Sequence, residues 1–229
     1  MAFTWTTRKI ILSLIIVSFI MIGVIFAVNK WTTPDTPAFQ DQFTREFLLK
    51  DGEAPEGFHL FESGTGKYTM IFPANYVVEE SSYYRKKGRS SGVINTENVY
   101  LHQDGVHPKK NQQIKGINLF LKPDGNVLID ADLKILLEQI NAPSDTKIET
   151  IKDDNKTVYY AENIDDYIGE EGTDTYFYFY AFITDNHSKQ ALYFELEDTC
   201  FNSNEKKCEI DFDKEKAMAL KMLESVQFK

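Results

Sequence analysis

The sequence predicts an α+β fold in which helices pack on both faces of an antiparallel sheet, with one transmembrane helix before the domain. Three observations support this prediction: an uncharged apolar run at residues 10–28, a strand-like run at 176–183 that is apolar on both faces, and amphipathic segments at 130–140 and 213–226. Apolar residues make up 42% of the 229 residues, and aromatic residues 14%. This supply is enough for the core of one ordinary domain.

The apolar run at 10–28 (IILSLIIVSFIMIGVIFAV) contains no charge. As a helix it would be roughly 28 Å long, close to the hydrocarbon thickness of a bilayer. A cleaved signal peptide is the alternative, but its apolar region is usually shorter and ends in small residues, and here only Ala27 is small. A lipidated signal needs a cysteine at its end, and the first cysteine is Cys200. We therefore expect an uncleaved anchor.

Charge predicts how this helix is oriented. Arg8 and Lys9 precede it and only Lys30 closely follows it, so residues 1–9 are expected in the cytoplasm and the C-terminal domain outside. Trp5 and Trp31 flank the span, as interfacial aromatic rings do. The 22 remaining basic residues face 35 acidic ones, a formal charge of −13, which argues against binding nucleic acid.

The rest of the chain divides into a stalk at 29–57, polar and rich in proline, and a domain at 58–229. The stalk includes one short helical stretch at 39–49. In the domain, β-rich runs bounded by turn residues predict strands, and apolar residues at helical spacing predict two helices. The expected strands are 67–72, 92–102, 115–121, 147–152, 157–164, 175–184 and 190–196, and the expected helices are 130–140 and 213–226.

The run at 176–183 (YFYFYAFI) carries most of the architectural prediction. Alternation places phenylalanines on one face and tyrosines on the other, and neither face is plainly polar. Such a strand is usually central and covered on both sides. On the next strand Tyr193, Glu195 and Glu197 point away from the core, which predicts a position nearer the sheet edge.

The order of these elements resembles a known family. A strand ending in proline (YTMIFP, 68–73), further strands, a middle helix, an aromatic hairpin and a C-terminal helix closing on LESVQF (223–228) look like the PsbP-like α/β/α sandwiches, which include many bacterial envelope lipoproteins and accessory factors. The resemblance covers roughly residues 58–229 and is one of pattern. It implies a non-catalytic binding or assembly role. The missing signal cysteine departs from the lipoprotein members.

Three groups of residues are candidate sites. Cys200 and Cys208 close a short loop that would be oxidised outside the cytoplasm, the alternative being two unrelated thiols. The exposed tyrosines would form a ligand face for sugar or peptide, although a covering helix is the preferred interpretation. A basic run would bind polyanions, although the preferred interpretation is that its charges only keep a hairpin soluble. The tyrosines of the ligand face are Tyr176, Tyr178 and Tyr180, and the basic run contains Arg85, Lys86, Lys87 and Arg89.

No cofactor or metal is predicted. His102 and His107 do not have a recognised metal-ligand spacing, and the acid-rich stretch at 162–174 lacks the calcium-loop order, so solvated loops are expected at both places. Residues 64–67 (GTGK) lack the remainder of a phosphate-binding motif and indicate a glycine turn. Nucleophile-elbow and zinc-protease motifs are absent from the sequence.

These features predict a single-pass cell-membrane protein whose outer domain is a binding or accessory protein of the envelope. The expected partner is an envelope protein or a wall polymer. Two alternatives stay open: an extracytoplasmic enzyme, for example a hydrolase, and an assembly subunit of a membrane complex. The ligand and the oligomeric state are not predicted.

Overall fold

The computed structural model describes residues 14–18, 21, 34–86, 96–103, 113–122, 128–140, 142–143, 145–168, 173–201 and 208–229. Within the predicted anchor, residues 14–18 and 21 are helical and exposed. The rest of that anchor and the predicted cytoplasmic tail lie outside the described residues. Where positions are described, the structure has no helix long and apolar enough to span a membrane.

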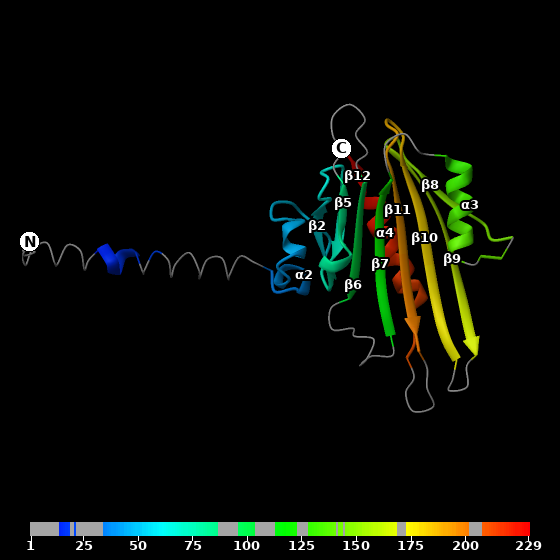
Figure 1. The fold of residues 1–229 in the computed structure, drawn as a ribbon, viewed down its shortest axis with the longest axis horizontal. Helices are drawn as coiled ribbons and strands as arrows, with labels where there is room; N and C mark the ends of the chain where they lie inside the picture. The colour runs from blue at the N-terminus through cyan, green and yellow to red at the C-terminus, as the bar shows by residue number, and fades with distance from the viewer. Residues whose placement is uncertain are drawn as a thin grey trace, which may run out of the picture.

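The domain consists of two sheets and two main helices (Figure 1). In chain order the elements are α2 (Pro37–Gln40), the 3-10 turn η1 (Thr44–Glu46), β1 (Leu48–Leu49), β2 (Phe58–Glu62), β3 (Tyr68–Pro73), β4 (Tyr76–Val78), η2 (Glu80–Ser82), β5 (Tyr84–Lys86), β6 (Thr96–Gln103), β7 (Gln113–Lys122), α3 (Ile129–Gln139), β8 (Glu149–Lys152), β9 (Lys156–Ile168), β10 (Thr173–Asp185), β11 (Ala191–Cys200), α4 (Phe212–Ser225) and β12 (Gln227–Phe228).

All pairings in both sheets are antiparallel. The larger sheet has the order β4-β6-β7-β11-β10-β9-β8, with β5 also paired to β6. The smaller sheet has the order β1-β2-β3-β12, so it combines strands from both ends of the domain. The fold is therefore α+β, as the alternating strand patterns predicted.

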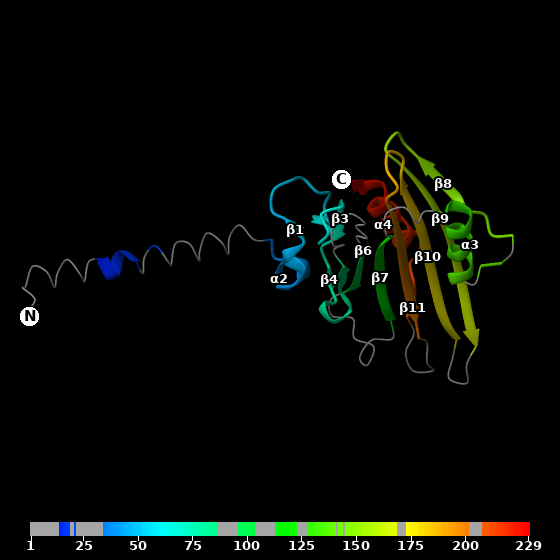
Figure 2. The same ribbon diagram turned by 45° about the horizontal axis from the view of Figure 1, so that its top comes forward.

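A helix lies on each face of the larger sheet (Figures 1 and 2). Met222 and Leu223 of α4 share the main core with Phe177 and Phe179, and α4 also contacts β3 of the smaller sheet. On the opposite face Leu136 of α3 packs in a second cluster with Tyr180 and Phe182. Successive residues of β10 thus face different helices, because side chains alternate along a strand.

The expected place of one strand near the edge of the sheet was wrong. The strand containing Glu195 and Glu197 is β11, which lies at the centre of the larger sheet between β7 and β10. Alternation along the strand places Tyr193, Glu195 and Glu197 on the face that carries α3, where the two glutamates line a groove.

The described part of the predicted stalk is also part of the domain. Ala38, Phe39, Phe47 and Leu48 are buried in the main core, and β1 pairs with β2 of the smaller sheet. The apolar residues of this segment therefore outweigh its proline-rich composition. The expected helix at 39–49 is reduced to the end of α2 and the short turn η1.

Candidate functional site: a polar groove on the larger sheet

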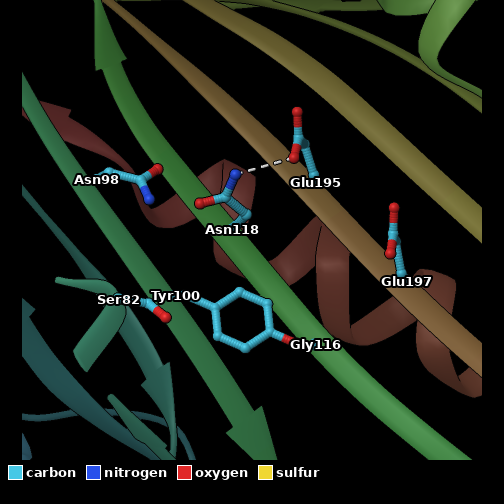
Figure 3. A pocket seen from close by; sticks show the side chains of 7 residues that line it. All are labelled: Ser82, Asn98, Tyr100, Gly116, Asn118, Glu195 and Glu197. Atoms are coloured by element: carbon cyan, nitrogen blue, oxygen red, sulfur yellow. Dashed lines mark hydrogen bonds between the residues drawn. The ribbon is translucent and has the colours of Figure 1, made fainter. Parts of the chain in front are cut away.

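A groove of about 330 Å³ lies on the face of the larger sheet that carries α3. Three neighbouring strands, β6, β7 and β11, supply its floor, and η2 supplies one residue at its margin (Figure 3). The lining residues are Ser82, Asn98, Tyr100, Gly116, Asn118, Glu195 and Glu197. None of these side chains is basic, and two carry carboxylates.

The register of the sheet explains why these side chains meet. Tyr100 of β6 is opposite Asn118 of β7, and Asn118 is opposite Glu195 of β11. The next residue across from Glu195 is Tyr180 of β10. Because residues opposite each other in a sheet share a face, this row runs continuously from the groove to the tyrosines of β10. The groove thus continues the predicted tyrosine face and borders the C-terminal end of α3, where Gln139 hydrogen-bonds Glu195.

Gly116 shapes the floor of the groove. A Cβ atom added at this position would lie 2.9 Å from Cζ and 3.0 Å from Cε2 of Tyr100. The tyrosine ring therefore lies against the glycine backbone, and only a residue without a side chain allows this close approach. As Figure 3 shows, the ring lies over β7 beside Asn118, so it forms an aromatic surface next to the polar groups.

Neutral groups supply the hydrogen bonds to the two carboxylates. Asn118 Nδ2 donates to Glu195 Oε2 at 2.9 Å, and the Tyr180 hydroxyl donates to Glu197 Oε1 at 2.7 Å. Asn118 Oδ1 is buried and accepts no hydrogen bond from the described residues. The groove consequently has more acceptors than donors.

Electrostatics in the groove favour neutral over negative forms. Burial raises the pKa of Glu195 and the nearby Glu197 raises it further, against hydrogen bonds from Asn118 and Gln139 that lower it. Burial also raises the pKa of Tyr100, and the carboxylates of Glu197 and Glu79 add to this effect. A positively charged ligand in the groove would stabilise the ionised form of both side chains and so lower their pKa values.

Comparison with known proteins places this fold. The family described as "Putative lipoprotein YvcA" matches residues 34–227. The chain belongs to this family. A curated relative of the same description, from Bacillus subtilis (strain 168), is 26% identical over 211 residues, which cover 85% of this chain and 78% of the relative. No solved structure matches the chain.

The family match begins at residue 34, so it includes the segment that was expected to be a stalk. This agrees with the burial of that segment in the core. The match does not name the PsbP-like proteins, and that resemblance stays a prediction.

The three tyrosines of the predicted ligand face differ in exposure. Tyr180 is buried in the cluster under α3. Tyr176 and Tyr178 are half-buried, and their rings stack with centroids 6.1 Å apart. Tyr176 also contacts the edge of Phe201. The helix therefore covers one end of the row and leaves the other partly open.

The two cysteines are joined in a disulfide, with their Cα atoms 5.8 Å apart. It ties the end of β11 to the segment before α4. The bond lies at the end of this central strand and contributes no side chain to the groove.

The basic run is only partly described. Arg85 and Lys86 are exposed on β5, whereas Lys87 and Arg89 lie outside the described residues. Arg85 donates a hydrogen bond to the carbonyl of Gly64. The structure therefore shows one basic residue of this run holding a neighbouring turn.

Residues 64–67 form the turn between β2 and β3, and the buried Glu97 fixes this turn. The backbone amides of Gly64 and Thr65 donate to its carboxylate at 2.6 and 3.3 Å, and Tyr83 donates from its hydroxyl at 2.9 Å. Two amides of the turn thus donate to a carboxylate of the protein, and the amides of Gly66 and Lys67 donate to Ser63.

Solvated loops were expected at residues 162–174 and around His102 and His107, but parts of both segments are β-strand. Most of the acid-rich stretch continues β9 as far as Ile168, and His102 is on β6 with its Nδ1 3.7 Å from Glu79. His107 lies outside the described residues. Within the described ranges no three His, Cys, Asp or Glu side chains are arranged to hold a metal ion.

Proposed function

We propose that this chain is a membrane-held protein whose domain works outside the cytoplasm as a binding or accessory protein of the cell envelope, with the polar groove as its binding site. The family match carries the proposal, because the matched family and its Bacillus subtilis relative are both described as a lipoprotein. A lipoprotein is attached to a membrane by its lipid. The groove adds a concave polar surface on a rigid sheet, the kind of position where small ligands bind.

The means of attachment is proposed to differ from that of a lipoprotein. The sequence contains only two cysteines, and both are in the disulfide of the domain. The apolar run at 10–28 supplies a hydrophobic segment of bilayer length directly before the domain. We infer that this run anchors the chain as a helix. A PsbP-like α/β/α sandwich remains our proposal for the fold type, supported by helices on both faces of the sheet.

The test is the location of the chain in intact cells and in membrane fractions. We expect the full chain to remain in the membrane pellet after alkaline carbonate washing, and the domain to be degraded when protease is added to intact protoplasts. Release by carbonate would contradict a helical anchor, and protection from protease would contradict an outer domain.

A matched pair of variants sharpens this test. Ile16→Arg with Val17→Arg places two charges near the centre of the run, where each costs about 2.5–3.5 kcal/mol on insertion scales. This double variant should lose carbonate resistance. Thr32→Arg with Thr33→Arg adds the same charge just after the run, and it should keep the chain in the membrane.

A further inference from the structure

Three of the four buried carboxylates among the described residues have a lysine of the protein as their partner. Lys122 pairs with Asp132, and Lys115 pairs with both Asp198 and Glu215. Lys216 pairs with Glu162 at 2.6 Å, and Lys229 pairs with Glu62 at 2.7 Å. Partly buried charges are costly unless a counter-charge or several hydrogen bonds compensate them. The domain normally supplies this compensation itself.

Glu195 and Glu197 do not follow this rule. No basic side chain of the described residues lies within ion-pair distance of either carboxylate. Glu97 also has no lysine partner, but it accepts hydrogen bonds from two amides and two hydroxyls. The groove carboxylates have fewer donors and repel each other. The groove therefore holds two neighbouring carboxylates, the half-buried Glu195 and the exposed Glu197, without a counter-charge from the described residues.

The same face of the sheet shows how this protein accommodates an ammonium group. Lys122 of β7 extends over the rings of Tyr193 and Phe182, with Nζ 5.7 and 5.8 Å from their centroids. Its ammonium group also contacts the carboxylate of Asp132. An aromatic ring and a carboxylate thus hold this cation together, a recognised arrangement for ammonium groups.

The groove repeats these two components without the lysine. The ring of Tyr100 lies on Gly116, and the carboxylates of Glu195 and Glu197 stand across β7 from it (Figure 3). We propose that the groove binds a ligand's alkylammonium group between these carboxylates and the Tyr100 ring. This inference rests on the proposed binding role of the groove and names the chemistry of its ligand. A lysine side chain and a free diamine both supply such a group.

The experiment measures binding to the full chain in detergent by titration calorimetry at low salt. Three probes are used: Nα-acetyl-lysine methylamide, 1,5-diaminopentane, and Nα-acetyl-norleucine methylamide, which lacks the ammonium group. We expect at least one of the two ammonium probes, the lysine amide or the diamine, to bind. The norleucine probe should bind at least about tenfold more weakly than that probe. Tighter binding of the lysine amide would point to a peptide source, and tighter binding of the diamine to a free amine.

Variants link this binding to the groove. Glu195→Gln and Glu197→Gln keep the side-chain shape, and each should weaken ammonium binding by about tenfold or more. Tyr100→Ala should also weaken it. Glu138→Gln changes an exposed carboxylate of α3 that pairs with Lys134; it is the matched control and should leave binding unchanged. Melting curves of each variant show that it is folded.

Several results would overturn the inference. Equal binding of the lysine and norleucine probes would show a binding groove that does not select ammonium, so the proposed function would stand and this inference would fail. Absence of binding by all three probes would remove both the ammonium site and the support for the groove as a binding site. A rise in melting temperature with calcium chloride, lost in the two glutamine variants, would assign the carboxylates to a metal ion instead.

Discussion

At the scale of single residues, Glu195 shows what an uncompensated carboxylate does to the free protein. Its pKa is raised by burial and by Glu197, so the folded protein holds this proton more tightly than the unfolded chain does. For such a group, stability is greatest at low pH and falls as pH rises from the unfolded pKa through the folded one. Above that window the ionised carboxylate destabilises the domain by a constant amount.

We therefore expect Glu195→Gln to stabilise the domain at pH 8, by about 0.5–2 kcal/mol, the usual range for improved surface charge. At pH 4, where the native carboxyl group is largely protonated, the gain should be smaller. Thermal melts at both pH values measure the difference. Glu138→Gln should change stability little at either pH. A loss of stability at pH 8 in Glu195→Gln would mean that an unseen cation already compensates this carboxylate.

Asp132 behaves in the opposite way. Burial alone would raise its pKa, but hydrogen bonds from Lys122, Tyr193 and the Leu128 amide outweigh this effect and lower the pKa. A lowered pKa contributes stability that is present above the unfolded value and is lost as pH falls through the folded value. Glu195 on the sheet and Asp132 on the helix that packs on the same face thus give the stability opposite dependences on pH, because Asp132 has a lysine partner and Glu195 does not.

At the scale of elements, Lys115 is one of the lysines that connect α4 to the larger sheet. Lys115 of β7 contacts Glu215 of α4, and its Nζ lies 3.1 Å from Asp198 of β11. Both acids are buried, and Gln113 adds hydrogen bonds to Asp198 at 2.9 and 3.0 Å. The ammonium group is shared between two carboxylates, so its loss would leave both without a counter-charge.

Lys115→Met should therefore destabilise the domain by about 3–5 kcal/mol, the range for breaking a buried ion pair by removing one partner. The loss should be larger at pH 8 than at pH 5, because protonation of Asp198, whose pKa burial raises, relieves the unpaired charge. Urea unfolding at both pH values checks this. Lys134→Met, at an exposed ion pair of α3, should change stability by less than about 0.5 kcal/mol. Equal effects of the two substitutions would show that the Lys115 cluster contributes no special stability.

In the groove, the Tyr100 ring of β6 packs on Gly116 of β7. The backbone φ of Gly116 is not in the left-handed region, and the three atoms nearest to an added Cβ all belong to Tyr100, so the cost of an alanine here comes from contact with that ring. Gly116→Ala should destabilise the domain by about 1–3 kcal/mol and displace the Tyr100 ring. In a Tyr100→Ala background the same glycine substitution should cost much less, which a double-mutant cycle of unfolding free energies measures. Additive effects of the two substitutions would contradict this packing.

The elements themselves were largely predictable from local patterns. Alternating apolar residues located β7, β9, β10 and β11, and helical spacing located α3 and α4, because both periodicities are set by residues close in sequence. The short strands β1, β4, β5 and β12 were missed, since two or three residues carry no periodicity, and the five-residue strand β2 was missed as well. The central place of β11 was missed because the outward side chains of Glu195 and Glu197 resemble those of a strand near the edge.

At the scale of the whole molecule, the groove could not be predicted because it is made by register. Asn98 and Tyr100 come from β6, Asn118 from β7 and Glu195 from β11, and nothing in the sequence states that these strands are neighbours. The one available signal was that Glu195 and Glu197 point to the tyrosine side of the sheet. The predicted tyrosine face was close to the groove, but the residues that line the groove are mostly polar and come mainly from β6, β7 and β11.

The smaller sheet has a consequence for how the protein is made. Its β12 pairs Phe228 with Tyr68 and Gln227 with Thr69, so this sheet joins residues from opposite ends of the domain. Contacts of such long sequence separation slow folding, because a long loop must close before they form. The fold cannot be completed until residues 227–228 have been synthesised. A chain delivered across a membrane from its N-terminus would then wait, with β3 unpaired on one side, until its final strand arrived, and this interval is when a chaperone or a protease would meet it.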